Sequence, residues 1–206
     1  MHYPAFFDDI AAIRLCDPLA EFLGAVEDGI LEYHYLDAVK LAGHSCPTVA
    51  SAYWMTHRAL RALYPDCLPE RGNIRVEFSK EADDGVTGVI ANVVGLLTGA
   101  AADGGFKGIG GAFDRRDKLF FAAEIASEIR FTRLDTGQAA EAAVNMQPVP
   151  AAQRIWELLP KCRNGSASTA ETAEFRQLWQ DRVRTLVLDH GEDERVFSVA
   201  VTALHS

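Results

Sequence analysis

The chain has 206 residues, of which 49% are hydrophobic and 24% are charged, a balance typical of a soluble globular protein with one domain or one domain and a small extension. Its formal net charge of −9 argues against a nucleic-acid partner, because binding to phosphates requires a basic surface. The four cysteines are far apart and form no Cys-x-x-Cys pair, which excludes a zinc ribbon and argues against a disulfide framework.

The N-terminal segment predicts short elements and no export signal. No basic region precedes an apolar run in the first nine residues, so we expect a cytoplasmic protein. Apolar residues recur at helical spacing over residues 5–26, with a break at Asp17-Pro18, and predict two short helices. Residues 30–35 are rich in strand-forming side chains, and residues 37–41 are compatible with a helical turn.

The most informative stretch is Gly-His-Ser-Cys-Pro at residues 43–47. Pro47 suits the first position of a helix, where its missing N–H costs nothing, and this places Cys46 at or beside the N-cap. The free N–H groups of a helix N-terminus stabilise a thiolate, the form of cysteine that binds metal or attacks an electrophile, and His44 lies nearby. Either residue alone is more often structural, because cysteine packs as a small hydrophobic side chain and histidine often caps a loop.

An amphipathic helix is predicted over residues 47–64, because its apolar residues fall on one face. His57 lies about three turns from Cys46, too far along the helix axis to join it. We therefore expect His57 at the surface or in an interface.

An uncharged run over residues 86–102 follows a predicted strand at residues 74–78 and an acidic turn. The run is barely long enough to span a membrane, and its glycines favour a buried helix with Asp84 as the N-cap. Small residues form a stripe along one face of this helix: Gly85, Gly88, Asn92, Gly95 and Gly99. Because glycine inside a helix costs about 1 kcal/mol relative to alanine, the stripe predicts the close approach of another backbone, a ligand or a second protomer.

The remaining chain alternates between loops and short elements. The glycine-rich loop at residues 104–111 fits neither the dinucleotide nor the P-loop pattern, and it can bring Phe106 and Lys107 against a pocket. We expect strands at residues 119–123, 129–134 and 140–146. Prolines at 148 and 150 mark a boundary between a domain over residues 1–147 and an extension over residues 148–206. The extension predicts a short helix at 155–159, a long helix at 170–188 and a strand at 196–204, packed on the same domain.

The order of these motifs resembles the FmdE-like family, which is named for the FmdE component of formylmethanofuran dehydrogenase. The motifs are Gly-His-x-Cys-Pro at a helix start, an acidic turn, a long apolar helix ending in Thr98-Gly99, and a segment of glycines around Lys107. The likeness covers roughly residues 30–135. It implies an α+β domain, with an antiparallel or mixed sheet packed by helices, that is often dimeric and binds a metal such as zinc near the His-x-Cys loop. The resemblance also implies an accessory role rather than an established catalytic one.

The resemblance implies a particular set of metal ligands. The family pattern reads His-Gly-His-x-Cys-Pro-Gly, and a cysteine precedes its downstream helix. In this chain Ala42 replaces the first histidine, Thr48 replaces the last glycine, and Asp84 lies near the expected second cysteine. A carboxylate can replace a thiolate on zinc. The implied ligands of zinc or another transition metal are therefore His44, Cys46 and Asp84, with an open fourth position.

Three functions remain open. The first is an accessory metal-binding protein of the FmdE-like type, a homodimer that packs through the face from Gly85 to Gly99. The second is a metal-dependent hydrolase or lyase, in which the metal lowers the pKa of a bound water and Lys107 contacts an anion. The third is a metal-free protein that binds a small molecule or cofactor in an apolar pocket lined by Tyr53, Trp54 and Phe106.

Overall fold

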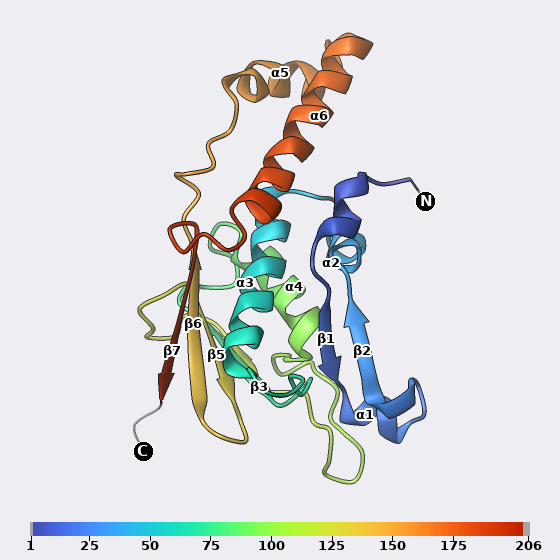
Figure 1. The fold of residues 1–206 in the computed structure, drawn as a ribbon, viewed down its shortest axis with the longest axis vertical. Helices are drawn as coiled ribbons and strands as arrows, with labels where there is room; N and C mark the ends of the chain where they lie inside the picture. Colours follow the sequence, from blue (N-terminus) through green and yellow to red (C-terminus); the bar gives the residue numbers. More distant parts are fainter. Residues whose placement is uncertain (1, 204–206) are drawn as a thin grey trace.

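In residues 2–203, which the computed structural model describes, five strands form a mixed sheet that carries a long helix on one face (Figure 1). The strand order is β4-β3-β5-β6-β7, and only β3 and β4 are parallel. The strands are β3 (Ile74–Phe78), β4 (Leu119–Phe120), β5 (Ile129–Arg133), β6 (Gln138–Val144) and β7 (Phe197–Ala203). The α+β class predicted from the sequence is confirmed.

The central helix is α3 (Pro47–Leu63), and it begins where the sequence predicts. Cys46 is its N-cap and Pro47 occupies its first turn. Eleven of its seventeen residues are buried, because β6, β7, α2 (Tyr35–Ala42) and α4 (Thr87–Thr98) all pack against it. In Figure 1, α3 and α4 lie between the large sheet and a smaller pair of strands.

The smaller sheet corrects one expectation for the N-terminus. Two helices were expected over residues 5–26, but only α1 (Pro18–Phe22) and the short 3-10 helix η1 (Ala5–Asp9) form there. Between them lies β1 (Ile13–Cys16), which pairs antiparallel with β2 (Ile30–Tyr33). Alternation within β1 buries every second side chain against the core, and this pairing outweighs the helical spacing of the wider segment. A 3-10 turn, η2 (Glu27–Gly29), connects α1 to β2.

Helix α4 is shorter than the uncharged run that predicts it. It ends at Gly99, whose φ of 72° closes the helix in the left-handed conformation that glycine adopts without strain. The predicted N-cap at Asp84 is wrong, because the capping position is Val86 and no side chain caps it. No helix within residues 2–203 is long and apolar enough to cross a membrane.

The C-terminal helices form a hairpin that extends beyond the sheet (Figure 1). These elements are α5 (Gln153–Asn164), α6 (Thr169–Arg184) and the π-helical turn η3 (Thr185–Asp189). The predicted capping box of Ser168 and Glu171 starts α6. After η3 the chain returns as β7, which pairs with β6 from Val144↔Phe197 to Gln138↔Ala203. The predicted last strand residue, at position 204, lies outside the described residues.

Candidate functional site

The loop between α2 and α3 holds His44 and Cys46, but their side chains are engaged locally. The Cys46 sulfur accepts a hydrogen bond from the Val49 N–H at 3.5 Å, and the residue is 8% exposed. His44 is exposed, and its Nδ1 lies 2.9 Å from the carbonyl oxygen of Ala42. The thiol therefore acts as a helix cap, and the imidazole lies in solvent beside it.

Asp84 does not complete a metal site with this loop. Its side chain is exposed in the turn before α4, where its carbonyl oxygen accepts the N–H of Thr87 at 3.2 Å. Nowhere in residues 2–203 do three or more His, Cys, Asp or Glu side chains form a group that could hold a metal ion. A zinc site needs about four such donors, or three and a water, so His44, Cys46 and Asp84 do not fit zinc as they are arranged.

Helix α6 fixes the loop from the opposite side. The Ser45 hydroxyl bonds Gln180 Oε1 and the hydroxyl of Tyr35, each at 2.9 Å. The Ser45 carbonyl accepts hydrogen bonds from Trp179 Nε1 at 3.1 Å and Gln180 Nε2 at 3.3 Å. Four hydrogen bonds on one residue make this loop a structural joint between α2, α3 and α6.

The aromatic residues predicted to line a pocket have different positions. Tyr53 is fully buried, and its hydroxyl donates to the carbonyl oxygens of Ala11 and Tyr33. Trp54 is buried and donates to the Gly191 carbonyl at 2.6 Å. Both residues belong to the core around α3, and neither lines the largest cleft.

The expected surface position of His57 is wrong. Its ring stacks on Trp54 with 4.7 Å between the ring centroids, and its Nδ1 is buried with no hydrogen-bond partner among the described residues. Burial, with a smaller contribution from the positive charge of Arg61, lowers the pKa of His57 to about 4. The segment around Gly191 covers this face of α3, and a pattern within the helix does not reveal that contact.

The largest hollow of the described structure is a cleft of about 950 Å³ along one face of α4. The five residues of the predicted stripe all line it: Gly85, Gly88, Asn92, Gly95 and Gly99. The opposite wall is largely apolar and includes Phe106, Leu119 and Phe121. Its volume lies in the range of about 300–1,000 Å³ found for small-molecule sites.

Close backbone contacts explain two of these glycines. A Cβ atom at Gly88 would lie 2.9 Å from the Ala82 carbonyl oxygen, and one at Gly95 would lie 3.1 Å from the Ala100 carbonyl oxygen. The predicted approach of another backbone is thus confirmed, and that backbone comes from the segments flanking α4. With the glycines in place, the floor of the cleft lies close to the helix axis.

The glycine-rich loop contributes one of its two predicted residues to the cleft. Phe106 lines the cleft and is 45% exposed. Lys107 is exposed and does not line it. Arg115 ties this loop to the end of α4, since its N–H donates to the Phe106 carbonyl at 2.8 Å and its carbonyl accepts the Ala101 N–H at 3.0 Å.

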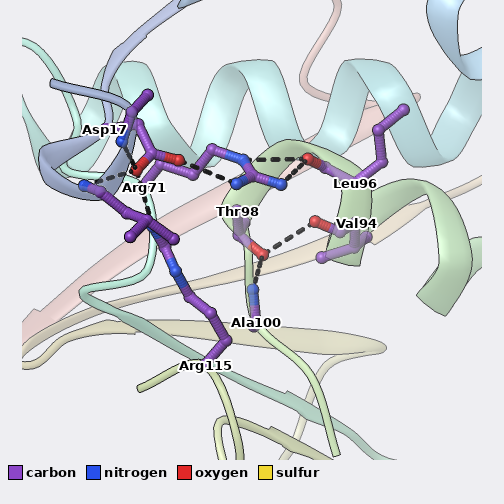
Figure 2. A network of polar contacts seen from close by, with 9 residues as sticks. Asp17, Arg71, Val94, Leu96, Thr98, Ala100 and Arg115 are labelled. Carbon is purple, nitrogen blue, oxygen red and sulfur yellow. Dashed lines mark hydrogen bonds and ion pairs between the residues drawn. The ribbon is translucent and has the colours of Figure 1, made fainter. Parts of the chain in front are cut away.

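At the C-terminal end of α4, two arginines converge on one buried carboxylate (Figure 2). Arg115 Nη2 lies 2.7 Å from Asp17 Oδ1, and Arg71 Nη1 lies 2.9 Å from Asp17 Oδ2. Arg71 also donates to the Leu96 carbonyl through Nε and Nη2. Both arginines line the cleft.

This cluster is charged although it is largely buried. The side chains of Asp17, Arg115 and Arg71 are 4%, 8% and 20% exposed. Burial opposes ionisation of Asp17, but the hydrogen bond from Arg71 and the charge of Arg115 outweigh it and hold its pKa below the usual value. Burial lowers the pKa of Arg115, yet arginine stays protonated in folded proteins.

Sequence reasoning missed the cluster as a site. Asp17 is recognisable as a helix N-cap before Pro18, and it does cap α1 through the N–H groups of Leu19 and Ala20. No local signal links it to Arg71 or Arg115, which lie 54 and 98 residues away.

The chain matches a known protein family over most of its length. The sequence model of the family described as FmdE, Molybdenum formylmethanofuran dehydrogenase operon, matches residues 41–195. No curated protein matches the chain. Among solved structures, an FmdE-like protein of tungsten formylmethanofuran dehydrogenase from Syntrophus aciditrophicus, determined at 1.90 Å resolution, is similar with a TM-score of 0.44 and 14% identity, over 84% of this chain and 74% of that chain.

Proposed function

Because this chain belongs to the FmdE family, we propose that it is an accessory protein, and that it binds a small organic molecule in the cleft along α4. The family description refers to the operon of a molybdenum formylmethanofuran dehydrogenase, which supports a role beside an enzyme. The observation that carries the proposal is the cleft itself, with its apolar walls, its glycine floor and two arginines at one end.

The chemistry of the lining supports binding over catalysis. Within residues 2–203, the only ionisable side chains that line the cleft are those of Arg71 and Arg115. General acid–base catalysis needs a group that can exchange a proton near neutral pH, and nucleophilic catalysis needs a hydroxyl, thiol, amine or carboxylate. The lining contains neither kind of group, so the cleft is suited to hold a molecule and not to transform it.

A zinc-centred function is less well supported. The Cys46 sulfur is committed to the N-terminus of α3, His44 lies in solvent, and Asp84 belongs to a separate turn. These donors do not fit a metal in this arrangement, and we derive no step from one.

The cleft can be blocked at its centre. Asn92 lies midway along α4, has an exposed side chain and lines the cleft. We expect the neutral dye Nile red to bind the wild-type protein saturably, and Asn92→Trp to weaken that binding about tenfold, because overfilling a site costs about 1–3 kcal/mol. Gln153→Trp, at the exposed start of α5 and outside the cleft, is the matched control and should bind as the wild type does. Equal binding by Asn92→Trp and the wild type would refute the proposal.

A second copy of the chain is the alternative occupant of the same face. If the face from Gly85 to Gly99 is a dimer interface, light scattering will show a dimer that Asn92→Trp converts to a monomer. A wild-type monomer that binds the dye supports the small-molecule proposal over this alternative.

A further inference from the structure

We infer that the ligand of the α4 cleft carries an anionic group, a carboxylate or a phosphate, that binds Arg115 where the cleft meets Gly99. This inference rests on the proposed function and names the chemical class of its ligand. It follows from the charge balance of the buried cluster, from one unpaired guanidinium nitrogen and from the shape of the cleft.

The cluster carries one more positive charge than negative. Two guanidinium groups share the single carboxylate of Asp17, and no second carboxylate of residues 2–203 lies within 4.0 Å of either arginine. Of the charged groups nearby, Asp114 is paired with Arg116, and Lys118 adds a further positive charge as it donates to the Gly72 carbonyl. A charge removed from water is costly unless it is paired, so an anion entering the cleft would relieve that cost.

One nitrogen of Arg115 supplies the donor. Nη1 is buried and has no hydrogen-bond partner among the described residues, whereas Nη2 is bonded to Asp17. The guanidinium occupies the space that side chains at positions 72 and 99 would fill, since a Cβ atom at Gly99 would lie 2.6 Å from Nη1. Glycine at both positions leaves this nitrogen beside the end of the cleft. An unmade charge-assisted hydrogen bond in a buried site indicates a missing acceptor.

The donor is also held in place. The backbone of Arg115 is bonded to Phe106 and Ala101, both of which line the cleft. Arg71 covers the Leu96 carbonyl, one of the free carbonyls at the C-terminal end of α4, and so offsets the partial negative charge that would repel an anion there. A fixed donor costs little entropy when a ligand binds.

The remaining length of the cleft is apolar. Its lining along α4 extends from Gly85 to Gly99, which is about 20 Å at 1.5 Å per residue, and Phe121 lies on its opposite wall. The ligand that fits is therefore elongated, with an apolar body and an anionic end group.

Three ligands with the same ten-carbon chain test the inference: decanoate, decyl phosphate and decanol, each below its micellar concentration and in competition with Nile red. We expect at least one of the two anions to bind about tenfold more tightly than decanol, because charge-assisted hydrogen bonds are about twice as strong as neutral ones. Comparison of the two anions identifies the end group.

Arg115→Gln should remove the preference for the anions and leave the affinity for decanol unchanged. Arg116→Gln is the matched control, because Arg116 is the exposed neighbour paired with Asp114 and does not line the cleft. It should keep the full preference.

Asp17→Asn tests the same charge balance in the opposite direction, and it covers the case in which Arg115→Gln does not fold. Asparagine also caps helices, so α1 keeps its cap while the cluster gains one net positive charge. The anions should bind about threefold or more tightly than to the wild type. Equal affinity of the wild type for decanol and both anions would overturn the inference and leave the cleft function standing. Failure of all three ligands to displace a dye that Asn92→Trp does not affect would instead overturn the proposed function.

Discussion

The buried histidine of α3 makes the stability of the protein depend on pH. His57 stacks on Trp54, and the charged groups around it are Arg58, Arg61 and Glu192. Burial is the main reason why its pKa falls from 6.5 to about 4. The folded protein therefore keeps this ring neutral at pH values where the unfolded chain protonates it.

The direction and size of the effect follow from linkage. Above pH 6.5 the ring is neutral in both states and has no effect on the free energy of unfolding. As the pH falls from 6.5 towards 4, only the unfolded state binds the proton, so stability decreases. Each pKa unit corresponds to about 1.4 kcal/mol, and the loss is about 2.5 kcal/mol at pH 4.5 and about 3 kcal/mol at pH 4.

Urea denaturation at pH 7.5 and pH 4.5 measures this loss. Carboxylates also titrate in this range, so the quantity to compare is the change in unfolding free energy of the wild type minus that of His57→Phe, which keeps an aromatic ring on Trp54. We expect the wild type to lose about 2.5 kcal/mol more than the variant. His44→Phe, which replaces an exposed ring, should behave as the wild type. Equal losses in the wild type and His57→Phe would refute the reasoning.

Two further predictions concern the loop and the cluster. Cys46→Ser should keep the N-cap of α3, remain within about 1 kcal/mol of wild-type stability, and share a substoichiometric transition-metal content with the wild type by elemental analysis; near-stoichiometric zinc that is lost in the variant would instead establish a metal site. Gly72→Ala should destabilise the protein by more than Gly110→Ala in chemical denaturation. Both glycines have positive φ, at 89° and 58°, which costs alanine about 1–2 kcal/mol, but only at position 72 does the added methyl collide with the Arg115 guanidinium. Equal destabilisation would show that the guanidinium is free to move.

The elements that the sequence predicts well are those specified by neighbouring residues. Proline at position 47 and a capping side chain at 46 are enough to place the start of α3, and Ser168 with Glu171 places the start of α6. The glycine stripe of α4 is likewise readable as a periodic pattern, and its consequence, a surface approached closely by other atoms, is found in the structure.

The features that the sequence does not reveal depend on distant contacts. Strand β1 has only four residues and becomes a strand because β2 pairs with it. The burial of His57 depends on the segment around Gly191, which lies more than 130 residues further along the chain. The arginine cluster joins three segments whose residues look ordinary in isolation, because exposed arginines and an N-cap aspartate are common everywhere.

The place of β7 in the sheet has a consequence for how the chain reaches its fold during synthesis. Strand β6 is complete at Val144, but its outer neighbour follows only after α5, α6 and η3. Until β7 emerges from the ribosome, the backbone N–H and carbonyl groups along one side of β6 have no strand to pair with, and such an open edge can pair with other chains. Folding of the sheet therefore waits for contacts of long sequence separation, which favours slow folding and makes the nascent chain a candidate for assistance by chaperones.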